Sequence, residues 1–313
     1  MHSTSRSARP TGTAAPSKTR RLPVLAALAA AVALVTGVTA PAYAAAPAPA
    51  PAPAPGEQAP GGQADSAEQG DRHLPAIHPE LDFAGSTVAA HEGRESTAGV
   101  PALAVTQTPG LDVSSYQGNV NWASVKANGA RFAYVKATEG TTYTNPYFAQ
   151  QYNGSYNAGL IRGAYHFALP DRSSGSSQAT WFVNHGGGWS RDGKTLPPAL
   201  DIEYNPYGAT CYGLSQSAMV SWIRSFSDTV HSRTGRYPTI YTTTNWWSQC
   251  TGDNGGFGTT NPLWIARYSS SVGTLPNGWS YQTFWQYADA GTFPGDQNLF
   301  NGAYDRLQAL ANG

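Results

Sequence analysis

From Thr108 onward, short strand-like runs alternate with helix-like runs, and this alternation restricts the possible fold more than any other feature of the sequence. The strand candidates are rich in β-branched and aromatic residues. They cover residues 110–114, 132–137, 161–168, 199–203, 239–243, 263–268 and 283–287. The helix candidates between them cover 121–127, 145–158, 176–184 and 215–233. Such alternation predicts a parallel α/β sheet, either open or closed into a barrel.

The clearest helix candidate, 215–233, has one apolar face and ends near Gly235. That face is formed by Met219, Trp222, Ile223, Phe226 and Val230. After Thr243 the alternation weakens, and no good helix separates the last strand candidates. The pattern therefore predicts a barrel whose last third has lost its helices. The first strand candidate is followed by no glycine-rich loop, which argues against a dinucleotide site.

Residues 1–44 have the features of a signal peptide. Five basic residues and no acidic ones precede an apolar run at 22–38, and the small-x-small sequence Ala-Tyr-Ala stands at 42–44. A membrane anchor is the alternative, but Pro-rich sequence follows at once without a stop-transfer pattern. We expect export, cleavage and a secreted, extracellular protein. The arginine pair at 20–21 leaves twin-arginine export open.

Residues 45–108 are compositionally biased. Ala and Pro alternate through 45–55, which favours an extended chain. Residues 56–108 are rich in Gly, Ala and acidic residues and have no sustained hydrophobic period. We predict a disordered linker or pro-segment over 45–108, followed by a catalytic domain at 109–313.

The two cysteines, Cys211 and Cys250, predict one disulfide, because disulfides are the usual state of cysteine pairs in exported proteins. A metal site would need more cysteines or a nearby histidine cluster, so we expect no metal and no cofactor. Residues 109–313 hold 12 basic and 11 acidic residues. This near-neutral balance offers no basic surface for nucleic acid.

Acidic residues lie at the carboxyl ends of two strand candidates, where parallel barrels place their active sites. Asp112 belongs to the first, and Asp201 and Glu203 to the fourth. Residues i and i+2 of a strand face the same side, so Asp201 and Glu203 would both point into the barrel. Two close carboxylates raise the pKa of one of them and so supply a proton donor. A solvated acidic pair at a frayed strand end is the alternative reading.

Aromatic residues crowd the region after Pro109, which holds all nine tryptophans. Flat rings suit the faces of sugars, although packing in the core is the commoner role of any single ring. The candidates for substrate binding are Tyr134, Tyr165, Phe167, Tyr241, Trp264 and Trp285. His166 either hydrogen-bonds substrate or fills a structural position.

Five segments together resemble the motifs of glycoside hydrolase family 25, the Chalaropsis-type lysozymes. They occur in family order and lie within 109–313, and the similarity is strongest to secreted actinomycete members. The segments are Gly110-Leu-Asp-Val-Ser-Ser-Tyr-Gln-Gly118, Phe132-Ala-Tyr-Val-Lys-Ala-Thr-Glu-Gly140, Arg162-Gly-Ala-Tyr-His-Phe167, Leu200-Asp-Ile-Glu203 and Phe284-Trp-Gln-Tyr287.

The resemblance implies an α/β fold: a modified (β/α) TIM-like barrel with five βα units followed by three strands, preceded by a disordered N-terminal region. It also implies hydrolysis of the β-1,4 bond between N-acetylmuramic acid and N-acetylglucosamine in bacterial peptidoglycan. Glu203 takes the role of general acid, Asp201 assists it, and Asp112 and Asp296 complete the acidic set.

Two routes remain for the second half of the reaction. In one, the substrate's N-acetyl oxygen attacks while Asp201 orients it; in the other, an Asp carboxylate activates water or attacks directly. We favour the first, with Tyr165 and Asp112 positioning the sugar. Peptidoglycan is the expected partner of a monomeric enzyme that binds neither nucleic acid nor, after signal cleavage, membrane.

Two other functions are open. A chitinase of a similar barrel type would carry a longer run of alternating acids, but position 199 is an alanine. A non-catalytic wall-binding protein would have lost an acid, yet all four are present. Both observations favour the lysozyme.

Overall fold

The computed structural model describes residues 74–95 and 106–313. The predicted signal peptide lies outside these ranges, as do residues 45–73 and 96–105 of the predicted linker. Within the described ranges, no helix is both long and apolar enough to cross a membrane.

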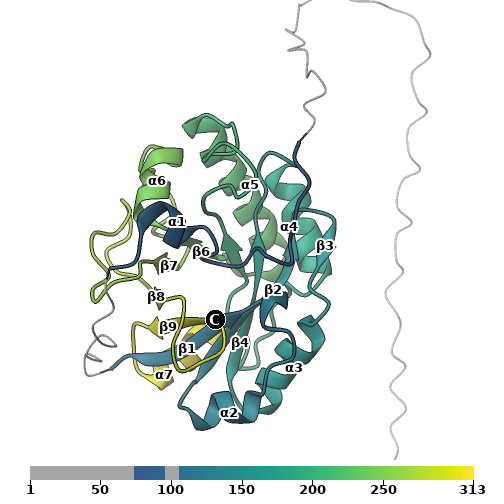
Figure 1. The fold of residues 1–313 in the computed structure, drawn as a ribbon, viewed down its shortest axis with the longest axis vertical. Coiled ribbons are helices and arrows are strands. Elements are labelled where there is room, and N and C mark those ends of the chain that lie inside the picture. The colour runs from purple at the N-terminus through teal and green to yellow at the C-terminus, as the bar shows by residue number, and fades with distance from the viewer. Residues whose placement is uncertain (1–73, 96–105) are drawn as a thin grey trace, which may run out of the picture. The chain divides into compact units, whose positions relative to one another are not determined.

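The barrel is built from eight strands, and a ninth short strand pairs with one of them (Figure 1). The strand order is β1-β9-β8-β7-β6-β5-β4-β2-β3, and pairing of β1 with β2 closes the barrel. The strands are β1 (Thr108–Val113), β2 (Phe132–Glu139), β3 (Tyr143–Thr144), β4 (Ile161–Phe167), β5 (Ala199–Asp201), β6 (Thr239–Thr242), β7 (Leu263–Ala266), β8 (Phe284–Ala288) and β9 (Asp296–Phe300). All neighbouring barrel strands are parallel except β9, which runs antiparallel to β8 and β1.

The helices follow the predicted arrangement in its main feature. The elements are α1 (Val88–Glu92), the 3-10 turn η1 (Ser115–Gln117), α2 (Trp122–Ala127), α3 (Phe148–Asn157), α4 (Gly175–Asn184), α5 (Gln216–Thr234), α6 (Thr244–Thr251) and α7 (Tyr304–Asn312). Helices α2 to α6 follow β1, β2, β4, β5 and β6, and no helix separates β7, β8 and β9 within the described chain. Five βα units followed by three strands are therefore confirmed.

Several elements differ from the sequence prediction. Helix α6 begins directly after Thr243, where the sequence indicated no good helix. Its signal is short, since the helix has only eight residues, but the Thr243 side chain caps it by accepting from the Trp246 amide. Strand β9 carries three polar residues among its five and was not recognised as a strand. It pairs on both edges inside the barrel wall, which overrides its weak strand propensity.

Alternation along the strands divides the core into an interior layer and an outer layer. The interior layer includes Tyr134, Tyr165, Tyr241, Trp264 and Phe284, all fully buried. The outer layer lies between the barrel wall and the helices, and α5 contributes its predicted apolar face there. This helix begins where the Ser215 side chain accepts from the Ala218 amide and ends at Gly235, whose φ of 76° suits a left-handed cap.

The predicted disulfide is present. Cys211, in the loop after β5, bonds Cys250 of α6, with 5.3 Å between their Cα atoms. The bond spans 39 positions of sequence and therefore ties the loop that follows the acidic strand to the helix layer. In the chain-entropy account, a loop of this length adds about 3–4 kcal/mol to the free energy of unfolding.

Residues 74–95, called the covering segment below, are ordered and belong to the same compact unit as the barrel. The prediction of disorder is therefore wrong for this stretch. The segment has little apolar surface of its own, but Ala84 and Val88 are buried in the interior layer of the barrel. Its remaining contacts are largely hydrogen bonds to barrel side chains, which a search for hydrophobic periodicity does not detect.

Candidate active site

Four acidic side chains gather at the carboxyl end of the parallel strands. Asp201 is the last residue of β5, and Glu203 follows it. Asp112 lies near the end of β1 and pairs in register with Asp296, the first residue of the antiparallel β9. Each of the four is at most 3% exposed. The structure thus brings together all the acids that the sequence singled out.

Asp112 and Asp296 share amide donors supplied by the barrel wall. The side-chain nitrogen of Gln286 lies 2.9 Å from Asp112 Oδ2 and 3.0 Å from Asp296 Oδ2. Asn298 donates a second hydrogen bond to Asp112 Oδ2, at 2.6 Å. The neutral side-chain amides of β8 and β9 therefore hold this pair of acids in place through hydrogen bonds.

Asp201 and Glu203 have different surroundings. Among the described residues, neither carboxyl oxygen of Asp201 has a hydrogen-bond partner. Glu203 Oε1 accepts from the Gly85 amide at 2.8 Å, and the Thr87 hydroxyl donates to Oε2. Both of these donors belong to the covering segment. A buried carboxyl without a partner costs free energy, and that cost is typical of a group held ready for substrate.

Burial raises the pKa of all four acids. It raises the pKa of Glu203 to about 8, although the bonds from Thr87 and Gly85 act in the opposite direction. It raises the pKa of Asp112 to about 7 against the opposing effect of the two amides. For Asp201 and Asp296 burial is again the main cause, and the negative charges of Glu203 and Asp112, respectively, add to it; both pKa values lie well above the ordinary range. The set can therefore hold protons at neutral pH.

Three tyrosine hydroxyls border the acids. Tyr241 donates to Gln286 Oε1 at 2.7 Å, and Tyr268 donates to the same oxygen at 3.1 Å. The Tyr165 hydroxyl accepts from the Ala84 amide at 3.3 Å. Tyr165 and Tyr241 were predicted as substrate contacts, and both point toward the acids; Tyr268 was not predicted. The acids are therefore bordered by phenol hydroxyls as well as by the side-chain amides of Gln286 and Asn298.

Two predicted substrate contacts instead fill the barrel below the acids. The Tyr134 hydroxyl donates to the carbonyl of Pro197 at 3.0 Å, just before β5 begins, so it points toward the amino end of the barrel. Trp264 stacks on Tyr134 with 4.7 Å between ring centroids and donates to Asn298 Oδ1 at 2.7 Å. Both rings are fully buried. Their assignment as sugar platforms is corrected: they pack the interior, and Trp264 orients the amide that bonds Asp112.

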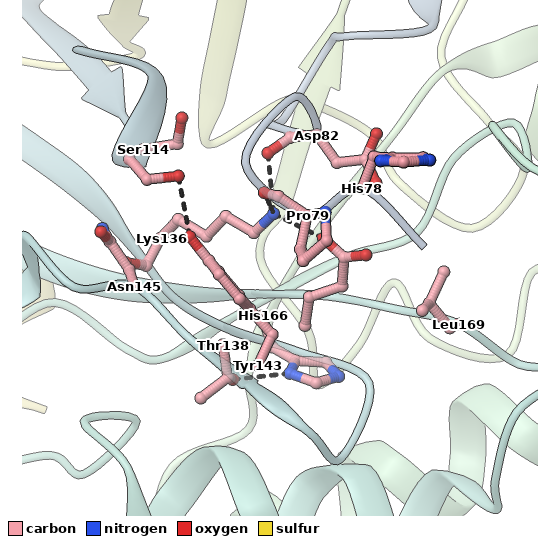
Figure 2. A network of polar contacts seen from close by, with 12 residues as sticks. His78, Pro79, Asp82, Ser114, Lys136, Thr138, Tyr143, Asn145, His166 and Leu169 are labelled. Carbon is pink, nitrogen blue, oxygen red and sulfur yellow. Dashed lines mark hydrogen bonds and ion pairs between the residues drawn. The ribbon is translucent and has the colours of Figure 1, made fainter. Parts of the chain in front are cut away.

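His166 and Trp285 face the outer layer, and their assignment is corrected too. His166 bonds Thr138 Oγ1 at 2.8 Å and Gln178 Oε1 at 3.0 Å, as Figure 2 shows for Thr138, and burial lowers its pKa to about 3. Trp285 donates to the carbonyl of Arg267 at 2.9 Å. Alternation explains both, because each follows an inward residue directly along its strand. Phe167 is buried, and its ring centroid lies 5.0 Å from Lys136 Nζ. It stays a predicted contact with substrate.

Sequence reasoning missed the polar residues that hold the acids. Gln286 lies two positions after inward Phe284, and Asn298 lies two positions after Asp296, so the strand period could have placed both inside. It also missed Lys136 and Glu139, which form a fully buried ion pair of 2.6 Å on β2. Lysine and glutamate within a continuous apolar strand were the available signal.

Among the described residues, no group of His, Cys, Asp and Glu side chains is arranged to hold a metal ion. The four carboxyls and three phenols offer acid–base and charge-stabilising groups at one end of the barrel. Most enzymes that cleave a glycosidic bond use two carboxyl groups that flank this bond.

Comparisons with known proteins agree with this chemistry. The family model described as glycosyl hydrolases family 25 matches residues 111–296. The N,O-diacetylmuramidase of a Chalaropsis species is 53% identical over 208 residues, which cover 65% of this chain and 99% of that protein. Lysozyme M1 of Streptomyces globisporus is 52% identical over 208 residues, covering 65% and 71%. The solved structure of a muramidase from Acremonium alcalophilum is 61% identical with a TM-score of 0.65, covering 66% and 99%.

Proposed function

Because the chain belongs to glycosyl hydrolase family 25, we propose that it is a lysozyme that hydrolyses the β-1,4 bond between N-acetylmuramic acid and N-acetylglucosamine in bacterial peptidoglycan. The family match and the muramidase and lysozyme relatives support this activity. One structural observation carries the residue assignment. Glu203, buried and with a raised pKa, stands two residues from Asp201, a buried carboxyl without a partner among the described residues.

Glu203 acts as the general acid in this proposal. Burial raises the pKa of Glu203 to about 8 while residues 74–95 cover it, and a sugar bound in their place would bury the carboxyl again. Glu203 would then carry its proton at neutral pH and give it to the glycosidic oxygen as the bond breaks. The leaving sugar departs with a new hydroxyl group, and positive charge develops on the anomeric carbon that stays behind.

Asp201 orients the substrate's N-acetyl group, whose oxygen then stabilises that anomeric carbon. A carboxyl with no protein partner among the described residues is free to accept a hydrogen bond from the amide N–H of the substrate. Burial holds the pKa of Asp201 well above the ordinary range, and the positive charge of the cyclised intermediate would lower it, so that Asp201 loses its proton and its negative charge balances the intermediate. Attack by water, activated by Glu203 in its deprotonated form, completes the hydrolysis and restores both carboxyls.

Asp112, Asp296 and the tyrosines position the sugar. Because Gln286 bonds both aspartates, the pair presents its remaining oxygens in a fixed geometry. The phenols of Tyr165 and Tyr241 offer hydroxyls to the sugar on a rigid, buried base. Phe167 adds apolar surface nearby.

Export to the extracellular space and action as a monomer without nucleic acid, membrane or cofactor complete the proposal. The signal-like N-terminus and the near-neutral catalytic region support it. A disulfide between the two cysteines fits an oxidising compartment.

The decisive experiment identifies the new reducing ends. Purified walls are digested with the protein, reduced with borohydride, and the released fragments are analysed by mass spectrometry. We expect reduced muramic acid at every new end. Reduced glucosamine at the new ends would instead identify a glucosaminidase. Because residues 74–95 bond both oxygens of Glu203, the digestion is repeated with a variant in which this covering segment is displaced. If that variant also produces no new ends, glycosidase activity is contradicted altogether.

A further inference from the structure

The covering segment lies across the mouth of the barrel, over the acids. Figure 1 shows it running from the side of α4 to α1, beside β6 and β7. Its hydrogen bonds reach side chains of β2, β4 and β8 and of the residues that follow β5 and β7. It therefore contacts five of the eight barrel strands or the residues directly after them, and not only one edge.

Its central residues bind the proposed general acid directly. The Gly85 amide and the Thr87 hydroxyl each donate to one oxygen of Glu203. With both oxygens engaged, Glu203 cannot approach a glycosidic oxygen while the segment is in place.

The backbone around Gly85 also occupies the polar groups proposed to hold the sugar. The Ala84 amide bonds the Tyr165 hydroxyl, and the Ala84 carbonyl oxygen lies 2.8 Å from the Gln286 side-chain nitrogen, so it shares the two amide hydrogens with the aspartates. The Gly85 carbonyl oxygen lies 3.2 Å from the Tyr268 hydroxyl and shares its single hydrogen with Gln286 Oε1. Two consecutive peptide groups thus take the hydrogen bonds that a substrate's hydroxyl and amide groups would use.

A second anchor lies on the β2 side of the mouth (Figure 2). Lys136 Nζ donates to the carbonyls of Pro79 at 3.0 Å and Asp82 at 2.7 Å while it pairs with Glu139. The Tyr207 hydroxyl donates to the Asp82 carboxylate. Charge-assisted bonds of this kind are among the stronger ones in proteins, so they fix the segment's path into the site.

A third anchor holds α1 on the opposite side. The Tyr204 hydroxyl donates to Glu92 Oε1 at 2.8 Å, and the rings of His91 and Tyr204 stack at 4.0 Å. Arg94 forms an ion pair with Asp289, in the loop before β9. Tyr204 immediately follows Glu203, so this anchor also restricts the loop that carries the general acid.

The fit at Gly85 is too close for any other residue. Its φ is 96°, and a Cβ there would lie 2.2 Å from the Tyr268 hydroxyl and 2.7 Å from Gln286 Oε1. A glycine at this point lets the backbone approach the floor of the site as closely as a ligand would.

The barrel is a complete fold without this segment. The family match begins at residue 111, and 99% of the Chalaropsis muramidase aligns with 208 residues of this chain. A region outside the shared domain that fills the shared domain's active site has the features of an inhibitor and not of a structural support.

We propose that residues 74–95 are an autoinhibitory segment, which keeps the enzyme latent until it leaves the barrel mouth. The inference rests on the proposed function, because it takes the acids at the mouth to be the catalytic ones. Removal of the segment exposes Glu203, Tyr165 and Gln286 to substrate and leaves the barrel itself unchanged.

The test uses the full chain with Gly85→Leu, and Ala90→Leu as the matched control. Ala90 lies in the same segment, on α1, and is exposed, so that a leucine there meets solvent and keeps the helical backbone. We expect Gly85→Leu to raise the rate of wall hydrolysis by about tenfold or more, as the population with an open mouth increases. Ala90→Leu should keep the low rate of the parent chain.

Hydrogen exchange on the same three proteins measures occupancy independently of activity. Amides of residues 82–88 should be protected in the parent chain and in Ala90→Leu, and should exchange rapidly in Gly85→Leu. If the segment is protected and then displaced, but none of the proteins cleaves walls, the occlusion stands and the proposed function fails.

Three results would overturn the inference. One is a parent chain as active as Gly85→Leu. Another is rapid exchange of residues 82–88 in the parent chain. The third is a loss of activity when the segment is displaced, since that would make the segment a working part of the site. A specific protease site introduced between Glu95 and Thr106 repeats the test without altering Gly85, and cleavage should raise activity in the same way.

Discussion

The two pairs of acids at the barrel mouth differ in which part of the chain donates their hydrogen bonds. Asp112 and Asp296 are bonded by Gln286, and Asp112 also by Asn298, all within the barrel. Glu203 is bonded by the covering segment, and Asp201 has no partner among the described residues. The barrel itself donates hydrogen bonds to Asp112 and Asp296. Among the described residues it donates none to Glu203 and Asp201, which are left to bind the covering segment or a substrate.

This difference indicates a division of labour. Carboxyls tied by neutral amides stay in place and shape the site, since moving them would break buried hydrogen bonds. Carboxyls without barrel partners can exchange protons and bind substrate without first breaking such bonds. The two hydrogen bonds that Glu203 accepts from the covering segment indicate how it would bind the polar groups of a substrate.

The largest effect is expected for Glu203→Gln, which keeps the shape of the side chain but removes its proton. Wall hydrolysis, measured on enzyme whose covering segment has been displaced, should fall by about 10²–10⁴-fold, the usual contribution of a general acid. Turbidity clearance of bacterial walls measures it, while circular dichroism checks folding. Asp228→Asn, an exposed change on α5, is the matched charge control. Lysis retained at the parent rate would remove Glu203 from the acid role.

Asp201→Asn should have the next largest effect, about 10²-fold on kcat with little change in KM, because orientation of the N-acetyl group matters most in the transition state. The variant should also be at least as stable as the parent, since it replaces a buried carboxyl that has no partner among the described residues. Thermal unfolding and steady-state kinetics on soluble wall fragments measure the two. A loss of stability without a loss of kcat would show that Asp201 is structural.

Gln286→Leu tests the satisfied pair. Without this amide, Asp112 and Asp296 lose a shared donor, and we expect the free energy of unfolding to fall by about 1–3 kcal/mol. Activity should fall less than for the other pair, by about tenfold. Urea unfolding compared with Gln249→Leu, an exposed change on α6, gives the stability effect. An activity loss as large as that of Glu203→Gln would contradict the division of labour.

The sequence predicted much of this site and missed the rest for identifiable reasons. Asp112, Asp201 and Glu203 stood at strand ends in apolar surroundings, and Asp296 followed from the family motif. Gln286 and Asn298 were missed because a lone amide within a strand carries no charge signal. The covering segment was missed because its order depends on polar contacts with a distant part of the chain.

The aromatic residues show the same limit. Composition could indicate that rings line a barrel, but it could not tell Tyr165, which faces the acids, from Tyr134, which points to the barrel's other end. Strand tilt decides the height of each ring in the barrel, and that height is set by register between strands. No local pattern in the sequence records it.

Stability should depend on pH through the acids that burial protonates. The pKa values of Asp112 and Glu203 are raised to about 7 and about 8, above their values in the unfolded chain. Their contribution is complete below the ordinary carboxyl pKa and is lost as pH rises through 7 and 8. We expect Tm of the full chain to fall by about 10 °C or more between pH 5 and pH 8.5. Calorimetry of Glu203→Gln should show a smaller fall; an identical pH profile would mean that Glu203 is ionised throughout.

The smallest effect separates two neighbours on β4 that face opposite layers. Tyr165 points to the acids, whereas His166 bonds Thr138 and Gln178 in the outer layer. His166→Asn should lower the free energy of unfolding by about 1–3 kcal/mol, since it leaves a buried partner unsatisfied. It should leave kcat per folded molecule unchanged.

Tyr165→Phe should do the reverse and lower kcat several-fold, with little change in stability, because the Tyr165 hydroxyl bonds only the covering segment among the described residues. Steady-state kinetics and urea unfolding of both variants decide the matter. If His166→Asn lowers kcat as much as Tyr165→Phe does, the acids at the mouth depend on the outer layer, and inward or outward orientation is no guide to function in this barrel.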